Sequence, residues 1–248
     1  MCTVVVRRLP GEPTRLLALR DELTERAFDD PGEWWPEHPG VVGGRDRSAG
    51  GTWCASKVTT GVTALVLNRP ERRVAAAGAP SRGALPLLAV THERDWPAQL
   101  DLGGLDLSGP DLSGPDLSGM ASFALVLATP QSLTTWLFDG EQLSSSELGQ
   151  GTHMVTSGGA EDGKAARYLA AFQRAAFPDG WRDLVRADAP RDEPAELVVR
   201  HDFGGRVFAT VFGQLIEAQP DRLRVEHSRT PWLSDSWTTT VYRESGVT

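Results

Sequence analysis

Short runs of aliphatic and β-branched residues dominate the chain, and turn residues separate most of them. Runs of about four to eight such residues are typical of buried β-strands. Two of them, Thr3–Val6 and Leu16–Leu19, flank a Gly11-Glu12-Pro13 turn and predict two strands joined at the N-terminus. Further strands are predicted at Thr52–Val58, Thr63–Leu67, Phe123–Leu127, Thr134–Phe138, Val207–Ile216, Leu223–Glu226 and Thr238–Tyr242.

One segment has a clear helical period. Gly163–Phe177 predicts a helix, because apolar residues recur there every three to four positions and Pro178 ends the pattern. Ala84–Val90 fits a strand or a helix, since Pro86 near its start is tolerated in a first helical turn. Residues 28–51 are rich in Gly and Pro and predict a long ordered loop. Many strands with few helices predict a layered α+β domain.

The chain has 248 residues, and we expect residues 1–248 to form a single domain, because sheet-rich domains of this size are common. Its internal repeat is the pentapeptide Gly-Pro-Asp-Leu-Ser, at 109–113 and again at 114–118. With the related Leu105–Ser108 the repeat has three units, too few to bury the core of a solenoid. We therefore expect residues 101–119 to form a low-complexity loop inserted in the domain.

Charge and composition exclude several classes of partner. The formal net charge is −8, which disfavours binding to nucleic acid or to an anionic membrane surface. No apolar run approaches the roughly 20 residues that span a bilayer, and Val4–Val6 leads directly into two arginines, unlike a signal peptide. We therefore expect a cytoplasmic protein with free thiols at Cys2 and Cys54, a small-molecule partner and an oligomeric state that stays open.

Cys2 is a candidate nucleophile because it directly follows Met1. Methionine before a small second residue is the kind that aminopeptidases remove, and removal would give Cys2 a free α-amine beside its thiol. An α-amine has an unperturbed pKa of about 7.7–8.0 and can act as a base near neutral pH. A nearby cation would favour the nucleophilic thiolate. The alternative is that Cys2 is a small buried strand residue.

Arg20, Asp21 and Glu22 are three adjacent charges at the end of an apolar strand. If this strand pairs with the N-terminal strand, Arg20 and Asp21 lie beside Cys2. A guanidinium there would favour the thiolate, and a carboxylate would hold the α-ammonium. The alternative is a solvated cluster of charges in a turn. Cys54 follows Trp53 in a predicted strand and is expected to belong to the core.

Several motifs in the first 83 residues stand in an order and spacing specific to one family. They are Met1-Cys2, Leu19-Arg20-Asp21-Glu22, Trp34-Trp35-Pro36-Glu37-His38-Pro39, Gly43-Gly44-Arg45-Asp46, Ala49-Gly50-Gly51-Thr52-Trp53, Ala64-Leu65, Asn68-Arg69 and Ser81-Arg82-Gly83. In these motifs the chain resembles the NRDE family, also called the transport and Golgi organisation protein 2 family. The resemblance continues more weakly at His153–Ser157 and Phe212-Gly213, so that it covers most of the chain outside the repeat.

The resemblance implies a fold of the N-terminal-nucleophile (Ntn) hydrolase type, a four-layered αββα sandwich. It also implies distant kinship to cysteine acylases that cleave penicillin V and conjugated bile acids. By resemblance, Cys2 is the nucleophile and its own α-amine the base, while Asp21 anchors the amine and Arg20 tunes the thiol. The expected activity is hydrolysis of a linear amide or other acyl compound through an acyl-enzyme.

The chain departs from the family pattern at four positions. Leu19 and Ser157 stand where the family has Asn, and Gln214 and Leu215 stand where it has Thr and Arg. Loss of one donor to a developing oxyanion costs about 2.7–4 kcal/mol of barrier. Asn68 and His153 are the candidates to replace such donors on the oxyanion and substrate side.

The departures also favour an alternative function, which the resemblance suggests: non-catalytic handling of haem or lipid (trafficking) on the same scaffold. Haem would then be a ligand near His38 or His153, whereas the hydrolase needs no cofactor. The five histidines show no close ligand spacing, so no metal is expected. Trp34 is a further candidate for substrate binding in an apolar cleft, with packing of its loop as the alternative.

Overall fold

The computed structural model describes residues 2–69, 79–99, 117, 119–158, 163–187 and 196–244. Within these ranges the chain forms two antiparallel sheets, of seven and six strands, and three α-helices, as the α+β prediction requires. Except for Leu117 and Gly119, the repeat loop predicted at 101–119 lies outside the described residues. In the described part of the chain, none of the helices is both long and apolar enough to cross a membrane.

The larger sheet contains both chain-terminal strands. Its order is β13-β12-β11-β2-β1-β9, and β10 pairs with β11. The pairing expected between the first two strands is confirmed, with Thr3 opposite Leu19 and Val4 opposite Ala18. Its strands are β1 (Thr3–Arg8), β2 (Thr14–Leu23), β9 (Gly151–Thr156), β10 (Arg200–Asp202), β11 (Val207–Gln219), β12 (Arg222–Ser228) and β13 (Thr238–Arg243).

The smaller sheet follows chain order, β3-β4-β5-β6-β7-β8. The expectation of a loop throughout residues 28–51 is wrong at β3, where Gly43 faces Ala55 of β4. A Cβ on Gly43 would lie 2.5 Å from the Cys54 oxygen, so the glycine that suggested a loop allows close strand packing. The strands are β3 (Val41–Arg45), β4 (Thr52–Lys57), β5 (Val62–Asn68), β6 (Phe123–Ala128), β7 (Leu133–Phe138) and β8 (Leu143–Leu148).

Three α-helices accompany these sheets in the described residues. The ambiguous segment is helix α1 (Leu85–His92), with Pro86 in its first turn, between the short 3₁₀ segments Arg82–Ala84 and Glu93–Gln99. The predicted long helix is α2 (Lys164–Arg174). A further helix, α3 (Asp179–Arg186), was not predicted, since only two turns follow Pro178.

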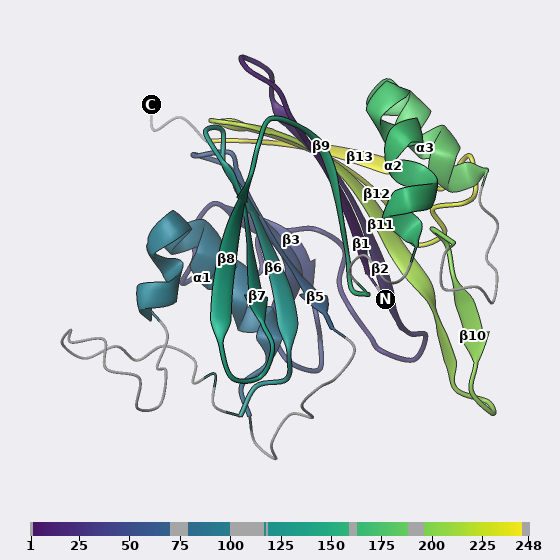
Figure 1. Cartoon of the computed structure of the whole chain (residues 1–248), viewed down its shortest axis with the longest axis horizontal. Coiled ribbons are helices and arrows are strands. Elements are labelled where there is room, and N and C mark those ends of the chain that lie inside the picture. The colour runs from purple at the N-terminus through teal and green to yellow at the C-terminus, as the bar shows by residue number, and fades with distance from the viewer. Residues whose placement is uncertain are drawn as a thin grey trace.

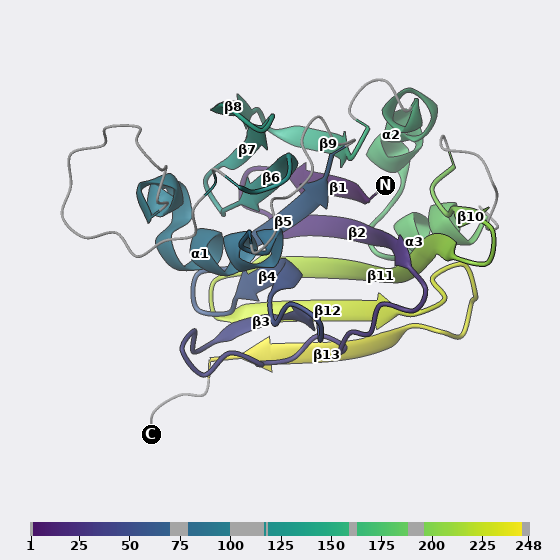
Figure 2. The ribbon, with the colours of Figure 1, turned by 90° about the horizontal axis from the view of Figure 1, so that it is seen from below.

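Hydrophobic clusters hold the sheets and helices together. Aliphatic side chains of both sheets form one cluster between them. A second cluster joins the smaller sheet to α1, and a third joins the larger sheet to α2 and α3. Helix α1 accordingly lies beside the smaller sheet, while α2 and α3 lie beside the larger one (Figures 1 and 2).

Strand β1 shows why a strand that lies between two packed layers is apolar at every position. Val4 and Val6 enter the cluster between the sheets, whereas Val5 enters the cluster with Phe172 and Trp181. Successive side chains of a strand point to opposite faces, so a strand covered on both faces is apolar at every position. The same packing places the residue before β1 at the end of the sheet, beside the end of β2.

Candidate functional site

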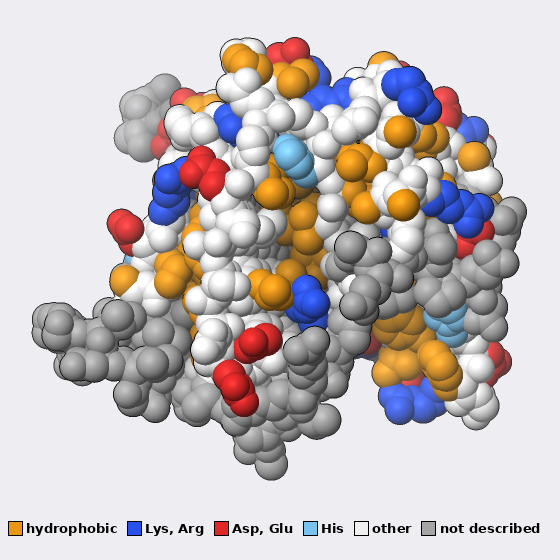
Figure 3. Space-filling view, in the orientation of Figure 1, with side chains coloured by type: hydrophobic (Ala, Val, Ile, Leu, Met, Phe, Trp, Pro, Cys, Tyr) orange, Lys and Arg blue, Asp and Glu red, His pale blue; other side chains and the backbone are white. Residues whose placement is uncertain are grey.

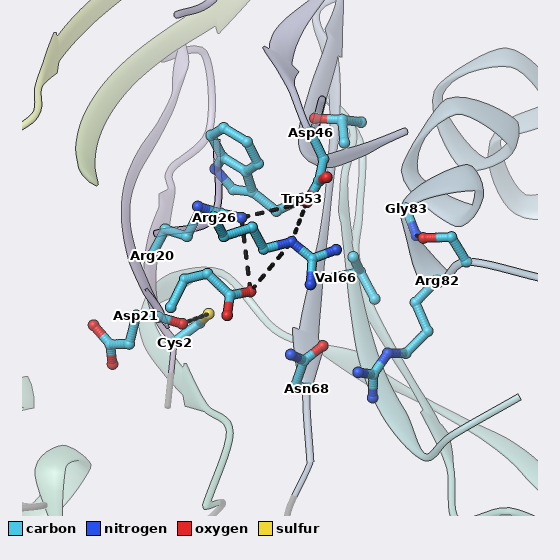
Figure 4. A pocket seen from close by; sticks show the side chains of 13 residues that line it. Cys2, Arg20, Asp21, Arg26, Asp46, Trp53, Val66, Asn68, Arg82 and Gly83 are labelled. Atoms are coloured by element: carbon cyan, nitrogen blue, oxygen red, sulfur yellow. Dashed lines mark hydrogen bonds and ion pairs between the residues drawn. The ribbon is translucent and has the colours of Figure 1, made fainter. Parts of the chain in front are cut away.

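Cys2 lines a cavity of about 100 Å³ at the start of β1 (Figure 4). Its side chain is partly buried, and Sγ lies 3.8 Å from the backbone oxygen of Asp21. The antiparallel pairing of β1 with β2 brings Arg20 and Asp21 to the level of Cys2, as the sequence predicted. The cavity is lined by Cys2, Arg20, Asp21, Glu22, Arg26, Asp46, Thr52, Trp53, Val66, Asn68, Ser81, Arg82 and Gly83.

The guanidinium of Arg20 packs over two aromatic rings. Its Cζ lies 4.5 Å from the ring centre of Trp53 and 5.0 Å from that of Phe28, and the residue is 4% exposed. Cation–π contacts of this kind strengthen when water is excluded. The arginine is therefore a fixed cation in the wall of the cavity.

Two carboxylates and a second arginine complete this ionic network. Arg20 Nη2 lies 3.4 Å from Asp46 Oδ2 and 3.7 Å from Glu22 Oε2, and Arg26 Nε lies 2.6 Å from the same Asp46 oxygen. Burial raises the pKa of Asp46, but the hydrogen bond and charge of Arg26, with two backbone N–H donors, outweigh burial and lower that pKa. Asp46 belongs to a motif that carried the family resemblance, whereas no sequence signal pointed to Arg26.

Asp21 contributes backbone to the cavity, while its carboxylate is directed elsewhere. Figure 4 shows the carboxylate pointing away from Arg26 and Asn68. It accepts a hydrogen bond of 2.6 Å from Thr210 Oγ1, and Lys164 Nζ lies 3.7 Å away, with both charged side chains fully buried. Lys164 was not among the predicted site residues, because its position in the first turn of α2 resembles that of a solvated lysine.

The backbone of Cys2 is bound to Ser157 at the end of β9. Cys2 N donates to Ser157 Oγ at 2.8 Å, and Ser157 N donates to the Cys2 oxygen at 3.1 Å. Ser157 therefore lies beside the nitrogen that would become the α-amine. Among the other departures from the family pattern, Leu19 and Leu215 are buried in the hydrophobic cluster beside α2 and α3, and Gln214 is a buried polar residue.

The environment of the Cys2 thiol disfavours its thiolate. Burial is the largest cause that raises the pKa of Cys2, and the charge of Asp21 acts in the same direction. Arg20 lowers this pKa, as expected, but its contribution is smaller and the net direction is upward. Desolvation outweighs the cation, and the role of Arg20 in tuning the thiol stays a prediction.

Asn68 and Arg82 lie on the opposite side of the cavity. Asn68 ends β5 and its side-chain amide points into the cavity (Figure 4). Arg82 Nη1 donates to the Ser122 oxygen at 2.8 Å. Arg82 reaches the cavity because its segment packs tightly against the start of β4. A Cβ on Gly51, the residue before β4, would lie 2.5 Å from the Gly83 carbonyl.

His153 and Trp34 do not line the Cys2 cavity. His153 lines a second cavity, and its Nε2 lies 2.9 Å from the Gly149 oxygen. Trp34 is 37% exposed, donates to the Asp30 oxygen and packs against the Arg45 guanidinium. The proposed binding roles of these two residues stay predictions.

The two cysteines have different environments. Cys54 is 2% exposed, which confirms its predicted place in the core, and burial raises its pKa to about 12. Both cysteines are free thiols. Among the described residues, no three His, Cys, Asp or Glu side chains are grouped so that they could hold a metal ion.

The fold and site define an α+β protein with a cysteine at the start of its first strand, facing a cavity of paired charges. The model of the family described as Transport and Golgi organisation 2 matches residues 1–177, more than two thirds of the chain. The chain therefore belongs to this family, as its motifs predicted. No curated protein matches the chain.

Proposed function

We propose that the protein is an N-terminal cysteine hydrolase that cleaves a linear amide or other acyl compound through an acyl-enzyme. One observation carries this proposal: Cys2 shares a cavity with the buried cation Arg20 and the amide of Asn68. These residues come from the two sheets, so the cavity exists only in the folded protein. A thiol, a fixed charge and an amide donor around one space are the groups that acyl transfer requires.

We also propose that the two sheets and three helices form the αββα sandwich of Ntn hydrolases. The support is the set of three hydrophobic clusters, one between the sheets and one between each sheet and its helices. In such a fold the nucleophile stands at the start of a central strand, and here Cys2 precedes β1.

In the proposed reaction, removal of Met1 converts the Cys2 nitrogen into an α-amine. Sγ attacks the substrate carbonyl carbon while the thiol proton passes to this amine, and an S–C bond and an oxyanion form. Collapse of the tetrahedral intermediate breaks the C–N bond, and the leaving amine takes the proton from the α-ammonium. Water then attacks the thioester and gives a proton to the α-amine, which returns it to sulfur as the acid leaves.

The surroundings of Cys2 support the amine as base. The Cys2 nitrogen already has an acceptor in Ser157 Oγ at 2.8 Å, which would orient an ammonium group as well. Because burial raises the pKa of the Cys2 thiol, the nucleophile is protonated near neutral pH and needs a base during attack. An α-amine with an ordinary pKa of about 7.7–8.0 is suited to this task.

Asn68 is the proposed donor to the oxyanion. Removing a single oxyanion donor costs about 10²–10³ in kcat. An Asn68→Ala variant is therefore expected to lose this much turnover while its folding, monitored by circular dichroism, is unchanged. Turnover within threefold of wild type would remove Asn68 from the mechanism.

The first test maps the reactive residue. An acylating activity probe is expected to modify Cys2 in the wild-type protein and not in Cys2→Ala, as mapped by peptide mass spectrometry. Cys54→Ala is the matched control and should be labelled like wild type, because the Cys54 thiol is buried in the core. Met1 retained on protein from the native host, or full turnover by Cys2→Ala, would rule the proposal out.

Alkylation of the thiol gives a second test. The rate at Cys2 is expected to rise between pH 6 and 9 as the α-ammonium loses its proton. A flat rate over this range would contradict the proposed base.

The alternative of haem or lipid handling is favoured by the second cavity, where His153 lies among apolar side chains. His153 Nε2 lies 2.9 Å from the Gly149 oxygen, so Nδ1 is the ring nitrogen that would bind haem iron. Titration with haem separates the two functions. A saturable Soret shift that is lost in His153→Ala would support haem handling, and no shift would count against it.

A further inference from the structure

A second cavity, of about 370 Å³, lies between the smaller sheet, the edge strand β9 and helix α2. Figure 3 shows hydrophobic side chains gathered in a furrow between β7 and β8 on one side and β9 and α2 on the other. Its volume lies within the range of about 300–1,000 Å³ typical of small-molecule sites. Its apolar lining is formed by Trp136, Leu137, Leu148, Met154, Val155 and Leu169.

The position of this cavity follows from sheet topology. Strand β8 is an edge strand of the smaller sheet, and β9 is an edge strand of the larger sheet. The cavity therefore opens where the two sheets end side by side. Apolar surface that forms a hollow at such an edge is characteristic of a binding site, because leaving it in water is unfavourable.

The linings of the two cavities come close in sequence at the ends of β5 and β9. Asn68 lines the Cys2 cavity and Arg69 lines the second one, and consecutive Cα atoms are about 3.8 Å apart. On β9, Thr156 lines the second cavity, and the next residue, Ser157, is hydrogen-bonded to the backbone of Cys2. Residues at the two cavities therefore follow one another along the chain on both segments.

The two spaces differ in chemistry. Arg20, Arg26, Glu22 and Asp46 make the Cys2 cavity strongly polar, whereas the second cavity is mainly apolar. We propose that the second cavity binds an unbranched acyl chain and that the substrate is an N-acyl amide with a polar amine portion. This assignment rests on the hydrolase proposed above, and it places the acyl chain and the leaving group on opposite sides of the scissile bond.

The expected gain in affinity follows from transfer of the substrate's acyl chain out of water. Each buried methylene is worth about 0.8 kcal/mol, which corresponds to about fourfold in affinity. For a series of N-acylglycines from acetyl to dodecanoyl, kcat/KM is expected to rise by about fourfold per methylene and then level off once the cavity is full.

The variant that tests the site is Leu169→Asp, because Leu169 lines the cavity from the partly exposed face of α2. It is expected to abolish the rise of kcat/KM with acyl-chain length. Leu148→Asp alters the opposite wall and serves as a second variant if the first fails to fold. Leu9→Asp is the matched control, since Leu9 is equally partly exposed but does not line the cavity.

Binding to Cys2→Ala, measured by calorimetry, separates the acyl site from the reaction. Tighter binding of N-octanoylglycine than of N-acetylglycine supports the acyl site even if the wild type hydrolyses neither, in which case only the hydrolase proposal fails. Affinity or turnover that is independent of chain length would overturn the acyl site. A chain-length dependence that Leu169→Asp and Leu148→Asp leave unchanged would do so too, as would binding of haem without binding of acylglycines.

Discussion

The buried pair of Lys164 and Asp21 should couple the start of α2 to the strand that carries the site. Substituting Lys164→Met keeps the length of the side chain and removes its charge. It leaves the Asp21 carboxylate in a fully buried position, where Thr210 still donates a hydrogen bond. A buried carboxylate that loses a cationic partner is costly, since water cannot replace that partner.

The magnitude can be worked from the distance. Two unit charges 3.7 Å apart attract each other by about 4–5 kcal/mol at the effective dielectric constant of about 20 that suits protein sites. Breaking a buried pair by removing one partner typically costs about 3–5 kcal/mol. We therefore expect Lys164→Met to lower the free energy of unfolding by about 3–5 kcal/mol.

The assay is a double-mutant cycle by urea unfolding at pH 7, with wild type, Lys164→Met, Asp21→Asn and the double variant. The control cycle uses Arg94 and Glu147, whose charges lie 3.2 Å apart with side chains 55% and 61% exposed. An exposed pair is worth at most about 1 kcal/mol. A coupling energy between Lys164 and Asp21 no larger than that of the exposed pair would refute the reasoning.

Three further predictions concern Cys54, Gly51 and Asp46. The Cys54 thiol ionises at a lower pH in the unfolded chain than in the folded protein, so the free energy of unfolding should fall as pH rises above about 9. Between pH 7 and 10, the wild type should lose about 1.4 kcal/mol more of this free energy than Cys54→Val, as measured by urea unfolding. Gly51→Ala should cost about 1–3 kcal/mol in thermal unfolding, because its Cβ would meet the Gly83 backbone, whereas Gly149→Ala, with open space around it, should change stability by less than about 0.5 kcal/mol. The lowered pKa of Asp46 stabilises the fold above about pH 4, so the stability difference between wild type and Asp46→Asn should shrink as pH falls toward 2. Equal pH profiles for the paired proteins, or equal losses for the two glycine variants, would contradict these expectations.

Most strands could be predicted because their sequences record the burial of both faces. The continuous apolar run of β6 is one case, with every residue buried. Strand β8 has exposed serines at its centre, so no apolar run marks it in the sequence. Strand β3 was missed because its glycines resemble those of a loop, although Gly43 is there to let β4 approach.

The site could be predicted only where it is local in sequence. Cys2 directly precedes β1 and Arg20 lies in β2, the next strand of the chain, so an ordinary pairing rule brought them together. Ser157 meets Cys2 across 155 positions, and Arg82 reaches the cavity through the packing of its segment on β4. No periodicity or turn signal encodes such contacts, because they depend on how the sheets and loops pack.

The geometry of Arg20 decides how the thiol can be activated. Its Nη2 atom is already shared between Asp46 and Glu22, and its Cζ lies over the rings of Phe28 and Trp53. The charge of Arg20 lowers the pKa of Cys2, but burial raises it more, so the net direction is upward. A thiol that is protonated at rest needs a base at the moment of attack, and its own α-amine would lie on the same residue. Processing at Met1, rather than the charge of Arg20, is therefore the step on which the proposed chemistry depends.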